Sequence, residues 1–234
     1  MLQKLVEIEG KLPRKLRLTR RMSRGFIHRM QLKTMRYYKG ADVADMIGRV
    51  RSEVDCQILS NEGFMLYSLA RAQRTFGGVM AEVGTYQGAS AKIICEAKGD
   101  TPLHVFDTFE GLQDVSSDDP LFRQNDYAAN EEQVRQYLSA YPNVTLHRGY
   151  FPADTGDAVA DDTFSFVSLD VDTYQSTHDS LEFFYPRLMP GGILVSHDYA
   201  QAEGVRKAFD EVLGPKPEPV IELLESQCMF VKLA

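Results

Sequence analysis

The sequence predicts an α/β fold: a doubly wound, mostly parallel sheet of seven strands that follows an N-terminal helical extension. Two observations predict this fold. Short apolar runs alternate with segments of helical periodicity between residues 79 and 213, and two further apolar runs then follow each other directly. The alternation is typical of parallel strands joined by helices, whereas the final two runs indicate an antiparallel pair at the end of the chain.

The expected elements follow one another in a definite order. The spacing of Val43, Met46, Ile47 and Val50 is that of a helix packed on a core, and Ser60 is expected to cap the next helix. Other helices are expected over 91–97, 131–141, 181–188 and 205–213. The expected strands cover 79–83, 103–106, 144–147, 164–169, 193–196, 220–224 and 229–233, with a turn at Pro190-Gly191-Gly192 before the fifth.

The chain of 234 residues, 44% of them hydrophobic, is long enough for one substantial domain with a small appendage. We expect the appendage to cover residues 1–57 and the α/β domain to cover 58–234. The sequence contains neither an apolar stretch of about 18 residues nor a signal-peptide pattern, so we expect no membrane span and a cytoplasmic location. Cys56, Cys95 and Cys228 lack metal-ligand spacing and are expected to be buried free thiols.

Charge is unevenly distributed along the chain. Residues 1–40 hold 12 Lys and Arg against 2 Asp and Glu, whereas the remainder is strongly acidic. Residues 14–39 also carry apolar side chains in a loose helical pattern. We interpret this segment as a lid or as an arm that docks subunits of a homo-oligomer; a solvated basic helix and a nucleic-acid or membrane-surface patch are the alternatives. The acidic body and the lack of an RNA-binding signature argue against nucleic acid.

A glycine-interrupted turn follows the first expected strand and opens a helix, with the spacing Glu82-x-Gly84-x-x-x-Gly88-x-Ser90. The N–H groups at such a helix end suit a negatively charged group. The spacing lacks the second glycine that makes room for a pyrophosphate in dinucleotide-binding turns. A ligand with a carboxylate for the helix end, and an ammonium group or ribose hydroxyls for Glu82, fits better, and S-adenosylmethionine has these groups. The alternative is an ordinary turn between strand and helix. The candidate cofactor-binding residues here are Glu82, Gly84, Thr85, Tyr86, Gly88 and Ser90.

Two later segments are further candidates for cofactor contacts. Asp107 ends the second expected strand, where its carboxylate is placed to accept hydrogen bonds from ribose hydroxyls, beside Thr108. An aspartate that merely caps the turn is the alternative. Gly149, Tyr150 and Phe151 follow the third strand and are expected to flank an adenine, although Phe151 is equally suited to core packing. The long polar connection over 111–127 is expected to be a mobile loop near the substrate, or else disordered.

Polar residues end most of the expected strands: Glu82, Asp107, Asp170, and the pair His197 and Asp198. Because ligands bind at the carboxyl ends of the strands in such sheets, this convergence favours an enzyme. Asp172 is expected on the substrate side of Asp170. No Ser-His-Asp or Cys-His arrangement fits the strand ends and no lysine-bearing phosphate loop is present, so the sequence does not favour a hydrolase or a kinase. The remaining histidines are scattered and are expected to be structural or exposed: His28, His104, His147 and His178.

Several motifs in this order resemble the macrocin O-methyltransferase (TylF-like) family of class I methyltransferases over roughly residues 58–233. These motifs are Glu82 to Gly88, Asp107-Thr108-Phe109-Glu110-Gly111, Leu169 to Tyr174, Tyr185-Pro186-Arg187-Leu188, Pro190-Gly191-Gly192 and His197-Asp198-Tyr199. The resemblance implies a divalent cation, Mg²⁺ or Mn²⁺, held by residues that match Asp170, His197 and Asp198, and a sugar hydroxyl as methyl acceptor. The family's usual acidic pair is His-Asp in this chain, which predicts weaker binding of Mg²⁺ than of a borderline ion.

The sequence thus predicts an S-adenosylmethionine-dependent O-methyltransferase for a small hydroxylated acceptor. Asp172 is the candidate general base, and Asp170 is a candidate contact of both cofactor and metal. One alternative keeps the fold without the metal and assigns the base to His197. A second alternative is a cofactor-binding scaffold protein without turnover.

Overall fold

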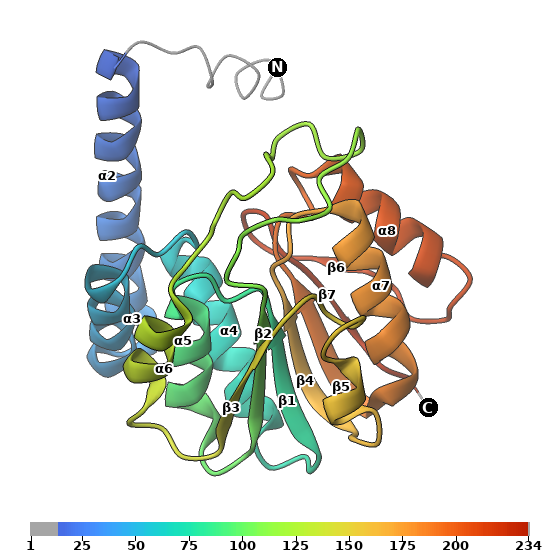
Figure 1. The fold of residues 1–234 in the computed structure, drawn as a ribbon. Coiled ribbons are helices and arrows are strands. Elements are labelled where there is room, and N and C mark those ends of the chain that lie inside the picture. The colour runs from blue at the N-terminus through green and yellow to red at the C-terminus, as the bar shows by residue number, and fades with distance from the viewer. Residues whose placement is uncertain (1–13, 234) are drawn as a thin grey trace.

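The computed structural model describes residues 14–233, and it confirms the predicted α/β fold with a seven-stranded sheet (Figure 1). The strand order is β3-β2-β1-β4-β5-β7-β6. Strands β1 to β5 are parallel, and β7 runs antiparallel to both β5 and β6. The strands are β1 Val79–Val83, β2 Leu103–Asp107, β3 Val144–Arg148, β4 Phe164–Leu169, β5 Leu188–Ser196, β6 Ile221–Glu222 and β7 Cys228–Val231.

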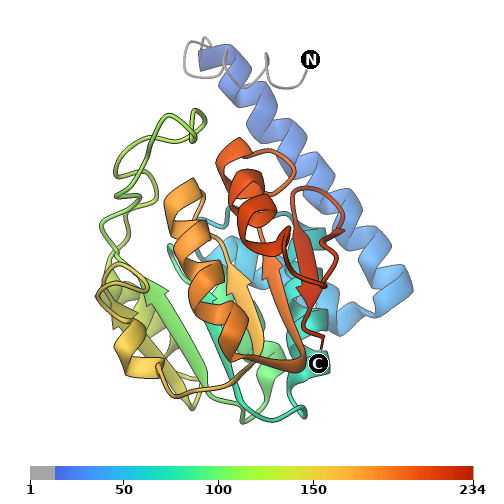
Figure 2. The same ribbon diagram turned by 90° about the vertical axis from the view of Figure 1, so that its right-hand side faces the viewer.

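Helices cover both faces of the sheet, as in a doubly wound fold (Figures 1 and 2). One face carries α3 Ala41–Glu53, α4 Ser60–Gln73, α5 Ala89–Lys98 and α6 Glu131–Leu138, with α2 Arg14–Lys39 outside them. The other face carries α7 Tyr174–Phe184 and α8 Glu203–Leu213. Short 3₁₀ helices lie at Gly156–Val159 and Tyr185–Arg187.

Alternation of side chains along the central strands builds both layers. In β1, Met80 packs with α3 to α6, and the next residue, Ala81, packs with α7 and α8. In β4, Phe166 likewise packs with α3 to α6, and Val167 packs with α7 and α8. These strands are buried on both faces because successive side chains point to opposite sides of the pleat. The cysteines are free and buried, as predicted.

Two local predictions are wrong. Ser60 does not cap α4, because the helix already includes it and Leu59 is the N-cap. The carboxylate of Glu62 accepts a hydrogen bond from the Leu59 N–H instead. Pro190-Gly191-Gly192 is not a turn before the fifth strand but an irregular part of β5, where Gly191 has a φ of +82° and a side chain at this position would meet the Phe76 ring.

The helical extension is tied to the α/β core at its C-terminal end. Ile47 and Val50 of α3 and Met35 of α2 belong to the same buried cluster as α4 and α5. Other side chains of α2 face outward, including Phe26 at 66% and Tyr37 at 81% exposure. Figure 2 shows α2 reaching beyond the rest of the fold. Within residues 14–233, no helix is long and apolar enough to cross a bilayer.

Candidate active site

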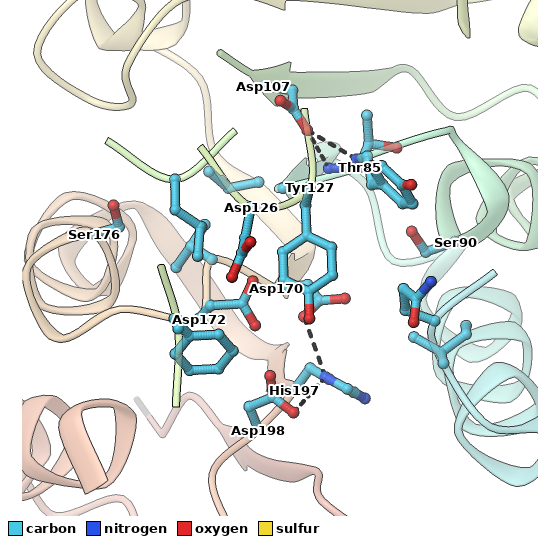
Figure 3. Close-up of a pocket in the computed structure, with 18 of the residues that line it drawn as sticks. Thr85, Ser90, Asp107, Asp126, Tyr127, Asp170, Asp172, Ser176, His197 and Asp198 are labelled. Carbon is cyan, nitrogen blue, oxygen red and sulfur yellow. Dashed lines mark hydrogen bonds and ion pairs between the residues drawn. The ribbon is translucent and has the colours of Figure 1, made fainter. Parts of the chain in front are cut away.

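A cavity of about 1170 Å³ lies at the carboxyl ends of the parallel strands (Figure 3). The turn after β1, the ends of β2, β4 and β5, the turn after β3 and the 111–127 loop all contribute to its lining, and Ile27 of α2 reaches it as well. This volume exceeds the range of about 300–1,000 Å³ typical of one drug-sized ligand, so the cavity has room for more than one small molecule.

Both glycines of the predicted cofactor turn are required by contacts within the protein. Gly84 has a φ of +81°, and a Cβ at this position would clash with the carbonyl oxygen of Asp170. Gly88 is the left-handed N-cap of α5, and a Cβ there would press on Val134 and Tyr137. Gly84 lines the cavity, whereas Gly88 does not. The ligand is therefore not the only reason for glycine at these positions.

The carboxylate of Asp107 holds this turn in place. Its Oδ2 accepts hydrogen bonds from the backbone N–H groups of Thr85 and Tyr86, both at 2.8 Å, and its Oδ1 accepts one from Phe109 at 2.7 Å. Burial raises the pKa of Asp107. The residue lines the cavity beside Thr108, Thr85, Tyr86 and Ser90. The turn-capping alternative is thus observed, and contact with a ribose stays a prediction.

Glu82 lies beneath the cavity rather than in its wall. The side chain is fully buried and absent from the cavity lining. Neither carboxylate oxygen makes a hydrogen bond of strict geometry, although the side chains of Thr85 and Ser90 lie close enough to oppose the rise of its pKa. Burial raises its pKa to about 8. A direct contact between Glu82 and a cofactor therefore stays a prediction.

The segment after β3 both packs in the core and lines the cavity. Phe151 is only 4% exposed and packs against Phe106 and Phe184, with ring centroids 4.5 and 4.9 Å apart, yet it also lines the cavity. Tyr150 and Gly149 line the cavity too, and the Tyr150 hydroxyl donates to Asp114 at 2.9 Å. Core packing of Phe151 is therefore observed, and stacking on an adenine stays a prediction.

Carboxylates of the 111–127 loop cap the N-terminus of α7. Asp119 accepts a hydrogen bond from the Tyr174 N–H at 2.7 Å, and Asp114 accepts one from the Ser176 N–H at 2.9 Å. The loop thus satisfies N–H groups that a helix leaves free at its start, and negative charge is favourable there. These contacts hold the loop beside the cavity, and its mobility stays a prediction.

Tyr127, at the end of this loop, is a cavity residue that the sequence reasoning missed. Its ring meets the ring of Tyr86 edge to face, with centroids 5.7 Å apart, and it lies near Asp170 in Figure 3. Burial and the charges of Asp172, Asp198 and Asp170 raise its pKa. The loop carries no periodic pattern, so the sequence offered only the proximity of 111–127 to the substrate as a signal.

Left-handed backbone at residues other than glycine gathers around this cavity. Tyr86, Tyr127, Asp172 and Asp198 all have φ between 52° and 64° and all line it. This conformation is uncommon for residues other than glycine, least so for Asp and Asn, and such residues often occur at functional sites.

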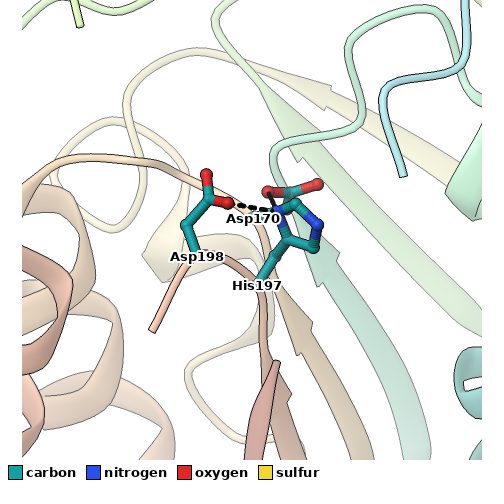
Figure 4. A group of neighbouring side chains, drawn as sticks. All are labelled: Asp170, His197 and Asp198. Atoms are coloured by element: carbon teal, nitrogen blue, oxygen red, sulfur yellow. Dashed lines mark ion pairs between the residues drawn. The ribbon is translucent and has the colours of Figure 1, made fainter. Parts of the chain in front are cut away.

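Asp170, His197 and Asp198 form one cluster at the ends of β4 and β5 (Figure 4). Nδ1 of His197 lies 3.2 Å from Oδ1 of Asp170 and 2.9 Å from Oδ1 of Asp198. On the other side of the ring, Nε2 lies 3.2 Å from Oε2 of Glu62. Burial opposes a charge on His197, but Asp170 and Asp198 raise its pKa well above the usual value. Burial also opposes ionisation of Asp198, but His197 lowers the pKa of this carboxyl.

The cluster fits a divalent cation. Each of Asp170, His197 and Asp198 offers one ligand atom, and these atoms lie within 4.8 Å of one another. Two carboxylate oxygens and one imidazole nitrogen suit Mn²⁺ or Fe²⁺ better than Mg²⁺, which prefers oxygen ligands.

Asp172 also lines the cavity, next to this cluster. Burial, together with the charge of Asp198 and a hydrogen bond to it, raises the pKa of Asp172 well above the usual value. The pKa of its neighbour Asp170 is also raised, mainly by burial. The structure therefore brings together all three predicted metal ligands and the predicted base.

The sequence of the chain is similar to those of known O-methyltransferases. Residues 70–216 match the family described as macrocin O-methyltransferase (TylF). A tetracenomycin rhamnosyl 4'-O-methyltransferase from Streptomyces olivaceus is 34% identical, with 53% of this chain and 53% of the relative aligned. Demethyldecarbamoylnovobiocin O-methyltransferase from Streptomyces niveus is 28% identical, with 57% of each chain aligned. The chain thus matches only about half the length of these relatives.

Solved structures share the fold. The O-methyltransferase NovP superposes with a TM-score of 0.68 at 22% identity, covering 78% of this chain and 84% of NovP. The calicheamicin methyltransferase CalS11 gives a TM-score of 0.67 at 17% identity, covering 83% of this chain and 93% of CalS11. At these identities the likeness supports the class I methyltransferase fold alone.

Proposed function

Because the chain belongs to the macrocin O-methyltransferase (TylF) family, we propose that it transfers a methyl group from S-adenosylmethionine to a hydroxyl of a sugar on a small natural product. The observation that carries this proposal is a single cavity that contains both the glycine turn after β1 and the cluster of Asp170, His197 and Asp198. A sugar acceptor is supported by the relative that is named for a rhamnosyl group.

The wall formed by the turn after β1 and the end of β2 is proposed to hold the cofactor. Thr85, Tyr86 and Ser90 line one side, and Asp107 and Tyr150 line others. Ser90 lies in the first turn of α5, whose N-terminus favours the carboxylate of the ligand. S-adenosylmethionine supplies an electrophilic methyl group on a sulfonium. The protein's task is then to hold the acceptor oxygen in line with that methyl group and to exclude competing water.

We propose that a divalent cation binds at Asp170, His197 and Asp198. When bound, such an ion orients an acceptor hydroxyl and lowers its pKa. The carboxylates bring the negative charge that attracts the ion, and they lie at the strand ends, where the acceptor side of the cavity begins.

Asp172 is the proposed general base. It lines the cavity beside the cluster. A cation bound nearby would favour its ionised form, in which the carboxylate can accept a proton from the acceptor hydroxyl. The alternative base, His197, is poorly placed in this structure, because Nδ1 faces Asp170 and Asp198 while Nε2 faces Glu62. Neither ring nitrogen is left to accept a proton from a hydroxyl.

We also propose that α2 docks a second copy of the chain. Its outward-facing Phe26 and Tyr37 are highly exposed, and residues 1–40 are basic whereas the rest of the chain is acidic. A basic helix with exposed aromatic side chains is complementary to the acidic body of another copy. Ile27 of the same helix lines the cavity, so docking would also restrict access to it.

The proposed reaction is tested by incubating the protein with methyl-labelled S-adenosylmethionine and a panel of glycosylated and non-glycosylated small molecules, with and without a chelator. Label transfer to a sugar hydroxyl supports the proposal, and loss of transfer on chelation that is restored by Mn²⁺ supports the metal site. Tight cofactor binding without transfer to any acceptor in either condition would favour the scaffold interpretation instead.

A further inference from the structure

Glu62 is a buried acid in the first turn of helix α4 that no sequence pattern singled out. The side chain is 2% exposed. Its Oε2 accepts a hydrogen bond from the Leu59 N–H at 2.6 Å and lies 3.2 Å from Nε2 of His197. Its Oε1 accepts hydrogen bonds from the N–H and the hydroxyl of Ser226, at 3.2 and 2.8 Å. A buried carboxylate with this many donors has a well-defined position.

Carboxylates flank the imidazole of His197 on both sides. Nε2 points to the side of Glu62, and the opposite nitrogen, Nδ1, faces Asp170 and Asp198. The Nε2 contact is within ion-pair distance but outside strict hydrogen-bond geometry. A ring flipped by about 180° around the Cβ–Cγ bond would place carbon atoms where Nδ1 and Nε2 now lie and would lose the contacts on both sides, so these contacts favour one orientation.

A second connection runs through Ser226. Its hydroxyl donates to Glu62, and its oxygen accepts a hydrogen bond from the Asp198 N–H at 3.4 Å. Glu62 therefore contacts His197 directly and Asp198 through one intermediate. Three segments far apart in the chain meet here: the start of α4, the turn between β6 and β7, and the end of β5.

We propose that Glu62 is a positioning residue that engages Nε2–H of His197 and so leaves Nδ1 as the atom presented to Asp170 and Asp198. Histidines that bind metals almost always donate their other N–H to a carboxylate, a carbonyl or a water, which sets the tautomer and the ring orientation. Glu62 performs that role for His197 from outside the cluster. The orientation of His197 is independent of turnover; the consequence for a bound cation rests on the proposed function.

The matched test compares Glu62→Gln with Glu53→Gln. Both changes convert one hydrogen-bonded glutamate into its neutral isostere, but Glu53 pairs with Lys92 and Tyr137, away from the cluster. The His197 ring is observed by ¹⁵N–¹H NMR in the metal-free protein and assigned by its loss in His197→Asn. Mn²⁺ binding is measured separately by electron paramagnetic resonance. Thermal unfolding of each variant reports on the helix cap.

In the unmodified protein we expect a hydrogen on Nε2 that exchanges slowly with solvent. Glu62→Gln should accelerate that exchange and weaken Mn²⁺ binding by about 10- to 100-fold, the usual effect of losing such a partner. Glu53→Gln should change neither. Ser226→Ala keeps the Glu62 charge and loosens its position, so it should give a smaller change in the same direction and replaces Glu62→Gln if that variant does not fold.

Two results would overturn the proposal. One is a His197 without a hydrogen on Nε2 in the unmodified protein. The other is a Glu62→Gln variant with a lower melting temperature but unchanged Nε2–H exchange, which would make Glu62 a helix cap only. If the unmodified protein binds no Mn²⁺, the proposed metal site fails, while the NMR comparison still decides the role of Glu62.

Discussion

Asp107→Ala should destabilise the fold as well as weaken cofactor binding. The carboxylate accepts hydrogen bonds from the backbone N–H groups of Thr85, Tyr86 and Phe109. Alanine leaves three donors without their partner. At about 1 kcal/mol for each donor, the low end of the usual range because the cavity admits water, the free energy of unfolding should fall by about 3 kcal/mol.

The assay is unfolding in urea. If the free energy of unfolding depends on urea concentration with the same slope in both proteins, the change in midpoint reports the change in stability. Glu110→Ala is the matched control, because Glu110 lies on the same segment but makes an exposed ion pair with Arg148, worth about 0–1 kcal/mol. The cofactor role is read in the same experiment. At about 100 times its Kd, S-adenosylmethionine should raise the stability of the unmodified protein by about 2.7 kcal/mol, and of Asp107→Asn by less.

The outcomes separate the two roles of Asp107. An Asp107→Ala variant within about 0.5 kcal/mol of the unmodified protein would refute the reasoning that the carboxylate holds the turn, because surface changes alone are that small. Lost stability with unchanged stabilisation by the cofactor would leave the turn-holding role and remove the ribose contact.

Three further changes have expected outcomes. His197→Asp restores an acidic pair, so metal titration should show a shift of preference from Mn²⁺ towards Mg²⁺; an inactive variant, together with native turnover that ignores chelation, would contradict the metal site. Deletion of residues 1–40 should leave a folded α/β domain that is less stable, because the buried side chain of Met35 is lost. Turnover should be impaired, or the mass measured by light scattering should change. Full activity at an unchanged mass would exclude the proposed docking of a second copy by α2. Burial lowers the pKa of His104 and His147 below 6.5 in the folded protein. The unfolded chain therefore binds more protons than the folded protein below that pH, and the free energy of unfolding should fall as the pH drops through 6.5. Thermal unfolding at several pH values should show a shallower fall in His147→Gln.

Strand positions and the fold class followed from local patterns in the chain. The apolar runs at 79–83 and 164–169 coincide with β1 and β4, because strands buried on both faces need continuous apolar side chains. The final antiparallel pair was likewise predictable, since two strands without an intervening helix have room only for a hairpin. The same logic placed Asp170 and Asp198 at one edge of the sheet, because parallel strands end on the same side.

Contacts between distant segments were not predictable from such patterns. Glu62 reads as an ordinary residue in the first turn of a helix, and nothing in its neighbourhood along the chain indicates His197, which lies 135 positions later. The pairing exists because α4 and β5 pack on one another in the fold. Tyr127 is similar, because a loop without hydrogen-bonded periodicity is directed only by its anchors, here Asp114 and Asp119 at the start of α7.

The glycine turn illustrates both sources of information. Its spacing predicted a strand, a sharp turn and a helix, and the left-handed φ of Gly84 and Gly88 agrees. The reason for each glycine came from packing: the carbonyl of Asp170 occupies the space beside Gly84, and α6 occupies the space beside Gly88. Local sequence determines which backbone conformations are allowed, because those depend on each residue's own sterics, whereas the neighbour that fills a given space depends on how distant elements pack.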